Sequence, residues 1–216
     1  ICGKRKCTTI SCSEGEHIES LKLNKQATYV NNGINMENLQ KLMDEVGSLE
    51  QHPFTVFTIG RICYQKNPTL FNQIALAMPN VRFLWIGDGD LRNELTASNI
   101  TITGWKERKE ALKYSVSGDV FVLTSLWEGL PISLLEAMYM KKVCVVSDVI
   151  GNNNVIHNGK NGYVCNTLED YIVAIKERNP MLAEQAHKEI VNTYNTNVQA
   201  KKYAEIYNRS LECYVK

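Results

Sequence analysis

The sequence of 216 residues has no long hydrophobic run, few prolines and almost no net charge, and each absence excludes a class of protein. No stretch approaches the roughly 18 uninterrupted apolar residues of a membrane-spanning helix. With 5 prolines, 13 glycines and 44% hydrophobic residues, the composition is that of a folded domain. Because 24 Lys and Arg nearly balance 23 Asp and Glu, no overall field attracts nucleic acid, and any anion must be bound locally.

The beginning of the chain carries no targeting signal. Residues 1–6 contain two short basic runs with no apolar segment behind them, so we expect no signal peptide. The first residue is Ile1 rather than Met, and we therefore expect the chain to be a piece of a longer protein.

The seven cysteines form neither a disulfide framework nor a zinc site. Their number is odd, and three of them lie inside apolar runs, where a free cysteine acts as a small hydrophobe: Cys63, Cys144 and Cys165. Three more recur at an interval of five, which is not the spacing of zinc ligands: Cys2, Cys7 and Cys12. We expect no metal and a reducing compartment, hence the cytoplasm.

Two common phosphate-binding motifs are also missing. The sequence has no G-x-x-x-x-G-K-[ST], and Gly87 and Gly89 in GDGDLR lack the third glycine of the dinucleotide fingerprint. A classical P-loop and a standard NAD site are therefore disfavoured. The two glycines still allow a ligand to approach the backbone closely, and the alternative is a tight turn before a short helix.

From about Phe54 onward, short β-rich runs alternate with amphipathic segments, which is typical of a parallel sheet covered by helices. The predicted strands are 54–60, 81–87, 100–104, 119–125, 143–148 and a short edge strand at 162–165. The predicted helices are 67–78, 90–98, 106–116, 131–140, 168–176, 180–194 and a long last helix over 198–214. The fold class is α/β: a Rossmann-like, doubly wound parallel sheet with helices on both faces and further helices at the carboxyl end.

The first quarter of the chain is less regular. Residues 26–35 predict a strand and an Asn-Gly turn, and residues 36–46 predict a short helix. No clear element is predicted in the first 25 residues. Ligands of a doubly wound sheet bind at the carboxyl ends of its strands, so the function is sought in the loops that follow them.

The loop after the first strand of the sheet carries two cations. In IGRICYQKNP, Gly60 is followed by Arg61 and, five residues later, by Lys66. A guanidinium and an ammonium at the end of a strand can converge on one anion, and a diphosphate fits such a pair. The alternative is that both are solvated surface charges.

The segment 124–138 is the most informative. Glu128 lies at a junction between strand and helix, and Glu136 follows eight residues later, about two helical turns on. Gly129 permits close backbone approach, and Pro131 opens the helix, whose first N–H groups can bind phosphate. Carboxylates accept hydrogen bonds from sugar hydroxyls, so one segment can hold both parts of a nucleotide sugar. Glu136 has apolar neighbours and needs a partner if it is buried.

These residues resemble a known family. EGLPISLLE, from Glu128 to Glu136, is similar to the E-x7-E signature of retaining glycosyltransferases of family 4, which have the GT-B fold. In the same order, GRICYQKN resembles the family's Gly-Arg and Lys element, FLWIGDGDLRNEL its second strand with a Gly turn at Gly87, ITITGW its base-side loop, and NGKNGYVC its late Asn-Gly strand. The match runs from about Asn31 to Lys176.

The resemblance implies a role for each of these residues. Arg61 and Lys66, after Gly60, would neutralise the diphosphate as the sugar departs, and Glu136 would accept from ribose hydroxyls. Glu128, with the backbone of Gly129, Leu130 and Pro131, would face the hexose or its phosphate, and Gly104 and Trp105 would border the base. Arg61, Lys66 and Glu128 are thus the catalytic contacts expected of this half, and no metal or cofactor is needed. The donor expected is a UDP-sugar, with a GDP-sugar as the alternative.

The resemblance also implies a second domain, which this chain lacks. GT-B enzymes have two Rossmann-like domains, of which the carboxyl-terminal one binds the nucleotide sugar and the amino-terminal one the acceptor. Residues 1–46 would be a remnant of the acceptor domain and the passage between domains, 47–195 the nucleotide-sugar-binding domain, and 196–216 the helix that crosses back. The full-length enzyme would transfer a hexose with retention to a glycan or lipid-linked acceptor, in the cytoplasm or peripherally on the inner face of the cytoplasmic membrane. The chain alone is expected to be inactive.

Two departures limit the transfer of roles. Where many relatives place an acidic residue after a glycine, this chain has GNNNV with Asn152 to Asn154, so a contact to the sugar becomes neutral or absent. The histidine of the acceptor domain is not in the chain, and the four histidines present match no motif and are expected at the surface: His17, His52, His157 and His187.

Two alternatives remain at this stage. A nucleotide-sugar 2-epimerase of the GT-B fold would share the sheet and the diphosphate contacts but is not expected to carry the Glu128 and Glu136 pair in this context. A nucleotide-sugar-binding module without turnover would keep the donor site and lack the acceptor half.

Overall fold

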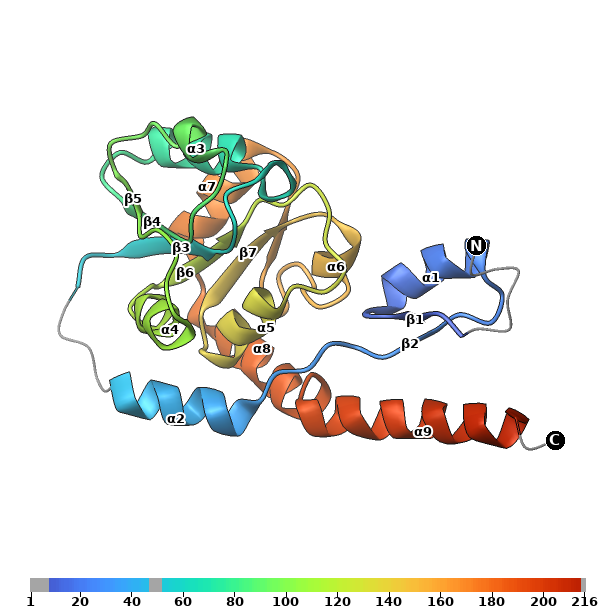
Figure 1. Cartoon of the computed structure of the whole chain (residues 1–216). Helices are drawn as coiled ribbons and strands as arrows, with labels where there is room; N and C mark the ends of the chain where they lie inside the picture. Colours follow the sequence, from blue (N-terminus) through green and yellow to red (C-terminus); the bar gives the residue numbers. More distant parts are fainter. Residues whose placement is uncertain (1–7, 47–51, 215–216) are drawn as a thin grey trace.

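A parallel sheet of six strands forms the centre of the molecule (Figure 1). The computed structural model describes residues 8–46 and 52–214. The strand order is β5-β4-β3-β6-β7-β8, and every pairing is parallel. The strands are β3 (Thr55–Ile59), β4 (Arg82–Ile86), β5 (Ile100–Ile102), β6 (Val120–Leu123), β7 (Val143–Ser147) and β8 (Tyr163–Cys165). The predicted α/β, Rossmann-like fold is confirmed, and the last strand lies at an edge, as expected.

Helices cover both faces of the sheet (Figure 1). Those of the central domain are α2 (Met36–Val46), α3 (Pro68–Ala77), α4 (Arg108–Val116), α5 (Ile132–Tyr139), α6 (Ile150–Asn153), α7 (Leu168–Glu177) and α8 (Pro180–Thr193). Buried residues of α2, α4 and α5 share one hydrophobic cluster, and those of α3 and α7 share another, while α8 contributes to both. A sheet with both faces covered requires strands that are apolar on both sides, which explains their near-continuous hydrophobic runs.

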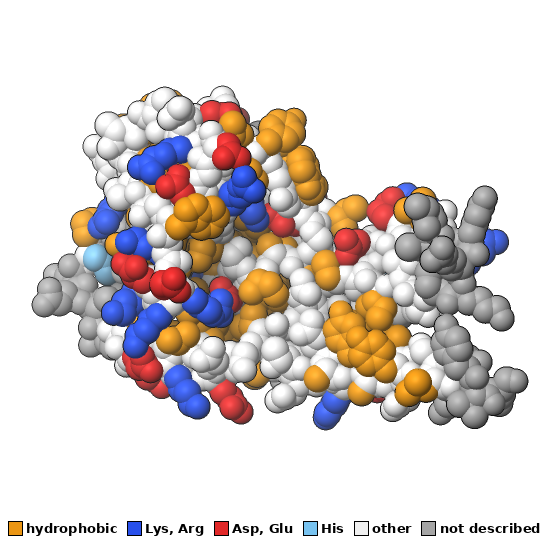
Figure 2. Space-filling view, viewed as in Figure 1, with side chains coloured by type: hydrophobic (Ala, Val, Ile, Leu, Met, Phe, Trp, Pro, Cys, Tyr) orange, Lys and Arg blue, Asp and Glu red, His pale blue; other side chains and the backbone are white. Residues whose placement is uncertain are grey.

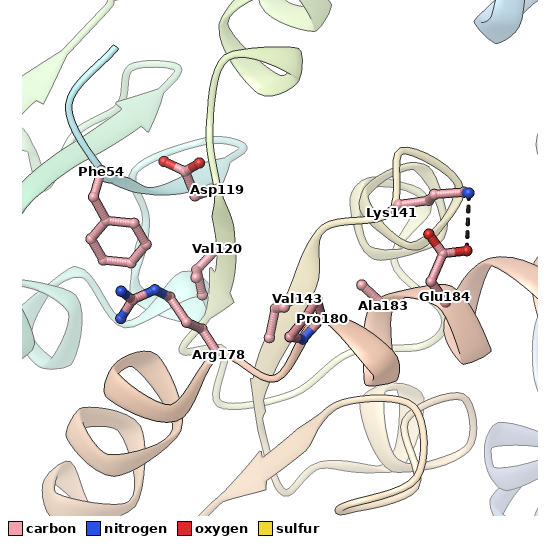
Figure 3. Close-up of a pocket in the computed structure, with 9 residues that line it drawn as sticks. All are labelled: Phe54, Asp119, Val120, Lys141, Val143, Arg178, Pro180, Ala183 and Glu184. Carbon is pink, nitrogen blue, oxygen red and sulfur yellow. Dashed lines mark ion pairs between the residues drawn. The ribbon is translucent and has the colours of Figure 1, made fainter. Parts of the chain in front are cut away.

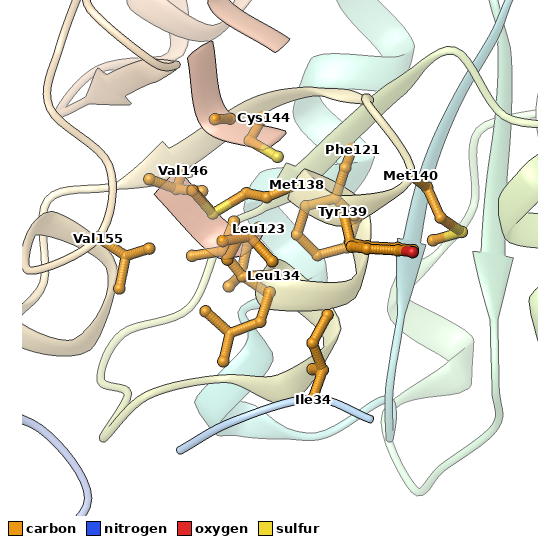
Figure 4. Packing of buried hydrophobic residues seen from close by; sticks show 14 of the residues in the cluster. Ile34, Phe121, Leu123, Leu134, Met138, Tyr139, Met140, Cys144, Val146 and Val155 are labelled. Carbon is orange, nitrogen blue, oxygen red and sulfur yellow. The ribbon is translucent and has the colours of Figure 1, made fainter. Parts of the chain in front are cut away.

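The two clusters follow the alternation of side chains along each strand. On β6, Val120 and Val122 face α3 and α7, whereas Phe121 and Leu123 face α4 and α5. Figure 4 shows Phe121 and Leu123 packed against Leu134 and Met138 of α5. Each of these residues is at most 1% exposed. The sheet is therefore held rigidly, and its loops start from fixed positions.

Within the described residues 8–25 there is regular structure, although the sequence predicted no clear element there. Two short parallel strands, β1 (Ile10–Ser11) and β2 (Thr28–Tyr29), flank helix α1 (Glu14–Leu23). The side chain of Ser13 accepts the backbone N–H of Glu16 and caps this helix. The sequence pattern does not predict these three elements, because α1 has few apolar residues at helical spacing and each strand is two residues long. Residues 1–7, with Cys2 and Cys7, lie outside the described residues.

Three further local features differ from the sequence analysis. The predicted helix at 90–98 is a single 3-10 turn, η3 (Arg92–Glu94), and α6 is a short helix that was not predicted. The predicted Asn-Gly turn is absent, and Gly33 lies instead in extended chain, where an added Cβ would lie 2.6 Å from the carbonyl oxygen of Asn195. Ile34 accepts from Thr196 N and donates to Tyr194 O, so close approach of two chain segments explains this glycine.

The histidines divide between surface and interior. His52 and His157 are exposed, as expected. His187 is half-buried and hydrogen-bonds through Nδ1 to the carbonyl oxygen of Tyr139 at 2.7 Å. His17 is half-buried against the ring of Tyr29, with 5.3 Å between ring centroids. The surface prediction was therefore wrong for two of the four.

The last helix, α9 (Thr196–Tyr214), extends away from the central sheet, and runs beside the β1–β2 segment (Figure 1). Tyr203 and Tyr207 on this helix stack with 5.9 Å between ring centroids, and Tyr207 and Leu211 are exposed. In Figure 2, hydrophobic side chains gather over this part of the molecule. Within the described residues, no helix has the length and apolar character needed to cross a bilayer.

Candidate functional site

The strand order has one topological switch point, between β3 and β6. From β3 the chain continues to β4 on one side, and from β6 it continues to β7 on the other. The loops after these two strands therefore lie at the carboxyl edge of the sheet beside the switch point, the place where open α/β sheets bind ligands. Both loops were singled out from the sequence, since one carries Lys66 and the other Glu128.

A pocket of about 410 Å³ lies at the opposite edge (Figure 3). It is lined by Phe54, just before β3, by Asp119 before β6 and by Val143 at the start of β7. Arg178 stacks on the ring of Phe54, 4.5 Å from its centroid, and Lys141 pairs with Glu184 at 2.9 Å. These are the amino ends of the strands, so this pocket is separate from the loops at the carboxyl edge of the switch point.

The loops after β3 and β6, which meet at the switch point, are hydrogen-bonded to each other. Leu126 donates its backbone N–H to Gln65 O at 2.8 Å, and Gln65 Nε2 donates to Trp127 O at 2.9 Å. The hydroxyl of Thr124 donates to Lys66 O at 2.7 Å. Three bonds between the loops fix the side chains they carry relative to one another, which is the preorganisation that a binding site needs.

Lys66 and Glu128 form an ion pair across the switch point. Lys66 Nζ lies 2.6 Å from Glu128 Oε1, and the side chains are only 16% and 7% exposed. Ser125 Oγ donates to the same carboxylate oxygen at 2.6 Å. A pair this sheltered from water is stronger than a surface pair, and it leaves the second carboxylate oxygen and further ammonium protons available to a ligand.

Arg61 does not share this partner. Its Nη2 lies 2.8 Å from Asp90 Oδ2, and both side chains are well exposed. The sequence predicted that Arg61 and Lys66 converge on one anion, whereas each cation here has its own carboxylate. An exposed ion pair contributes little to stability, so Arg61 can exchange Asp90 for a bound anion at a small cost in free energy.

The glycines of the site allow neighbouring loops to touch. Gly60 and Gly87 have φ of +147° and +143°, values that favour glycine. A Cβ on Gly87 would lie 2.1 Å from Gly60 O, which also accepts the indole N–H of Trp85 at 2.9 Å. Gly87 further forms an isolated bridge with Gly104, so three loop ends lie side by side. The close approach is thus between backbones, which neither of the two sequence interpretations of Gly87 foresaw.

Glu136 is buried and paired. It lies on α5 with its side chain 6% exposed, and Arg108 Nη2 of α4 contacts its Oε1 at 2.5 Å. The apolar neighbours noted in the sequence bury this carboxylate, and the expected need for a partner is met by a residue that the sequence did not single out. Arg108 comes directly after the 103–107 loop that contains Gly104 and Trp105; Trp105 is 68% exposed.

The segment between Glu128 and Glu136 contacts the N-terminal unit, by which we mean the described residues 8–35. Leu130 is buried, and its carbonyl oxygen accepts from Asn32 Nδ2 at 2.9 Å. A Cβ on Gly129 would lie 2.8 Å from Cys12 Sγ, so glycine permits this contact. Pro131 is the N-cap of α5, with no side-chain capping bond. The Glu128–Pro131 segment thus lies between the sheet and the N-terminal unit.

The three asparagines that depart from the family pattern are engaged in local contacts. Asn154 Oδ1 accepts the backbone N–H of Gly15 at 3.0 Å, which joins α6 to the first turn of α1. Asn152 is fully buried and donates to Ser147, and Asn153 donates to Asp148 at 2.8 Å. Asn154 therefore attaches the N-terminal unit to the central domain.

The thiol of Cys12 is kept protonated. Burial, the hydrogen bond with Glu16 and the negative charges of Glu16 and Glu128 raise its pKa to about 12. A raised pKa means that the thiolate is scarce at neutral pH, and thiolate is the reactive form. We expect iodoacetamide to alkylate Cys12 of the folded chain slowly at pH 8 and faster as the pH approaches 12. Mass spectrometry of peptides from the labelled chain measures the rate. Rapid labelling at pH 7 would contradict this.

Three site features were missed by sequence reasoning. Ser125 was visible only as the last residue of the predicted strand 119–125, Arg108 as one charge in the polar run KERKE, and Cys12 as part of a spacing unsuited to metal. Ser125 has a partial signal, because it precedes Glu128 by three residues in the same loop. Arg108 has none, since Glu136 lies 28 positions away, and Cys12 has only Glu16 near in the sequence, while Gly129 lies more than 100 positions away.

The comparisons with known proteins give the family. The family described as "Glycosyl transferases group 1" matches residues 53–178, more than half of the chain. The match includes both loops of the switch point and both glutamates of the E-x7-E segment. The chain belongs to the glycosyl transferases group 1, as the resemblance implied.

Individual relatives agree. The UDP-Gal:alpha-D-GlcNAc-diphosphoundecaprenol alpha-1,3-galactosyltransferase of Escherichia coli is 27% identical over 94% of this chain and 60% of its own length. The N,N'-diacetylbacillosaminyl-diphospho-undecaprenol alpha-1,3-N-acetylgalactosaminyltransferase of Campylobacter jejuni is 26% identical over 73% of this chain and 45% of its own length. The chain thus spans only part of each relative.

Solved structures establish the fold. Sucrose-phosphate synthase from Thermosynechococcus elongatus superposes with a TM-score of 0.83 at 17% identity, over 98% of this chain and 60% of that one. HepE from Anabaena, solved in complex with UDP and glucose, superposes with a TM-score of 0.81 at 16% identity, over 96% of this chain and 65% of that one. At such identities the likeness concerns the fold, which is that of the carboxyl-terminal half of these GT-B proteins.

Proposed function

We propose that this chain is the donor-binding half of a retaining glycosyltransferase that uses a nucleoside diphosphate sugar. The observation that carries the proposal is the sheltered Lys66–Glu128 pair at the switch point, with Lys66 Nζ 2.6 Å from Glu128 Oε1. A cation and a hydroxyl-accepting carboxylate side by side suit the junction of diphosphate and sugar. The relative from Escherichia coli is named for a UDP-sugar donor, and HepE was solved with UDP and glucose. A UDP-sugar is therefore the donor we propose, and a GDP-sugar is the alternative.

The chemistry of this half is stabilisation of the leaving group. Transfer of a hexose passes through an oxocarbenium-like transition state, and negative charge grows on the departing diphosphate. Lys66 stays in place to neutralise that charge, and Arg61 joins it by leaving Asp90. Glu128 and the backbone of Gly129 to Pro131 face the hexose, Glu136 accepts from the ribose, and Gly104 and Trp105 border the base. These charges lie on side chains of the chain itself, so the proposal calls for no metal.

The acceptor half is proposed to be a further domain of a longer protein. The E. coli relative is 60% covered by this chain, and its name specifies a lipid-linked acceptor. We divide the chain into the end of the acceptor domain and the passage (1–46), the donor domain (47–195) and a crossing helix (196–216). The exposed Tyr207 and Leu211 of α9 would pack on that acceptor domain. The acceptor is a glycan or a lipid-linked saccharide, handled in the cytoplasm or on the inner face of the cytoplasmic membrane.

Removing either of two donor contacts is expected to weaken nucleotide binding. Glu136→Ala and Arg61→Ala should each cost about 1.5 to 3 kcal/mol, the usual scale for hydrogen bonds to charged groups. Calorimetric titration with UDP, GDP and ADP, each free and sugar-linked, measures the change and identifies the base. Lys22→Ala, which breaks an exposed pair with Glu19 within α1, is the control. Unchanged affinity in both site variants would defeat the assignment.

A nucleotide-sugar-binding module without turnover is the second candidate, because the chain covers only 60% and 65% of two solved structures that it resembles. We expect residues 1–216 alone to transfer no sugar, since the proposal assigns the acceptor-side groups to a further domain. The discriminating experiment is a transfer assay with radiolabelled donor on both the chain and the full-length gene product. Transfer by the full-length protein supports the enzyme, and donor binding without transfer supports the module. Transfer by the chain alone would contradict its expected inactivity.

A further inference from the structure

Arg108 holds one oxygen of a buried carboxylate. It is the first residue of α4, and its Nη2 lies 2.5 Å from Oε1 of Glu136 on α5. The Glu136 side chain is 6% exposed, whereas that of Arg108 is 57% exposed. In the described part of the chain, the carboxylate of Glu136 has no other hydrogen-bond or ion-pair partner. The buried carboxylate of Glu136 therefore relies on a single partner, the guanidinium of Arg108.

This arrangement leaves the second oxygen of Glu136 free in a fixed orientation. An ionised carboxylate accepts on two oxygens, and a buried one that lacked its cation would pay a large desolvation cost. With Oε1 taken by Arg108, Oε2 is the acceptor that remains for a ligand hydroxyl. A guanidinium is a donor only, so Arg108 can pair with Glu136 without competing for the hydroxyl protons of a ligand.

The position of Arg108 connects the loop after β5 with helix α5. The residue before the helix, Glu107, ends the loop that carries Gly104 and Trp105, and α4 and α5 contribute to the same hydrophobic cluster on one face of the sheet. The guanidinium thus spans from the base-side loop to the helix of the second glutamate. The neighbouring Lys109 points to a different partner, Glu45 of α2, in an exposed pair.

We propose that Arg108 is a positioning residue that makes the donor site selective for a ribonucleoside diphosphate over its 2′-deoxyribonucleoside counterpart. The inference rests on the proposed function, because it assigns the free Oε2 of Glu136 to the 2′-hydroxyl of the ribose. Arg108 fixes the carboxylate so that this oxygen meets the 2′-hydroxyl, and a 2′-deoxyribose, which keeps only the 3′-hydroxyl at a different position, leaves the oxygen unpaired. A buried acceptor left without a donor is costly, so the hydroxyl becomes a requirement.

The test compares two ligands on four proteins. Calorimetric titration of the chain uses UDP and 2′-deoxy-UDP, or GDP and 2′-deoxy-GDP if the guanine nucleotide binds more tightly. Wild type should prefer the ribonucleotide by about tenfold. Arg108→Gln should weaken ribonucleotide binding by about tenfold and reduce the preference to about twofold or less, and Arg108→Lys should restore part of it. Lys109→Gln removes the adjacent charge of the same helical turn and should keep the full preference.

The outcomes separate the inference from the function on which it rests. If wild type prefers the ribonucleotide and Arg108→Gln keeps the preference, the inference is overturned while the donor site stands. If Lys109→Gln loses the preference equally, charge in α4 rather than positioning is responsible, and the inference is again overturned. A wild-type chain that binds no nucleotide contradicts the proposed function and the inference together. Urea unfolding of each variant identifies any loss of affinity that follows from unfolding.

Discussion

Lys66→Met is expected to weaken the binding of a nucleoside diphosphate by about 3 kcal/mol, the upper range for charged hydrogen bonds. The variant loses the cation at the switch point and leaves Glu128, whose side chain is 7% exposed, without its counter-charge. The uncompensated carboxylate then repels the diphosphate, so the loss exceeds that of Arg61→Ala. Calorimetric titration with UDP measures it, and uridine, which lacks phosphate, should bind both proteins equally.

The same substitution should destabilise the free protein. Removing one member of a sheltered ion pair strands the other, and we expect the free energy of unfolding to fall by about 2 to 3 kcal/mol in urea titration. Glu128→Gln in the Lys66→Met background removes the stranded charge and should recover most of that loss. Lys22→Met, from the exposed pair with Glu19, should leave stability and binding as they are. If the Lys66→Met variant binds UDP tightly, the diphosphate does not contact Lys66 and the assignment is wrong.

Gly87→Ala is expected to lower the free energy of unfolding by about 4 kcal/mol, from backbone strain and a steric clash together. Gly87 has φ of +143°, and its new Cβ would lie 2.1 Å from the carbonyl oxygen of Gly60. Relief requires moving the loop after β3 or the loop after β4, both anchored to buried strands. Urea unfolding followed by circular dichroism measures the effect.

Gly159→Ala is the matched control for the clash. Gly159 also has a positive φ, +71°, but no atom lies within 4 Å of its added Cβ, so only backbone strain of about 1 kcal/mol is expected. The difference between the two variants reports the contact between the loops after β3 and β4 together with the greater backbone strain at a φ of +143°. Equal losses in both would show that this contact has no energetic role.

The fold could be predicted because its signals are local. The strands of a parallel sheet are apolar on both sides and are separated by amphipathic helices, so the runs around Phe57, Trp85 and Phe121 stand out in the sequence. Predicted and observed strands differ by at most two residues at each end. The misses are elements without such signals. The polar helix α1 and the two-residue strands β1 and β2 are fixed by contacts with distant residues, such as that of Gly15 with Asn154.

The sequence by itself determined which of the main strands and helices follow one another along the chain, the loops that carry Lys66 and Glu128, and the apolar neighbours that surround Glu136. Only the tertiary structure decided which loops meet. The adjacency of β3 and β6 places Lys66 beside Glu128 across 62 positions, and the packing of α4 with α5 brings Arg108 to Glu136 across 28. Local patterns report the conformation of a segment, whereas ion pairs of this kind depend on long-range pairing of strands and packing of helices, which leave no periodic trace in the sequence.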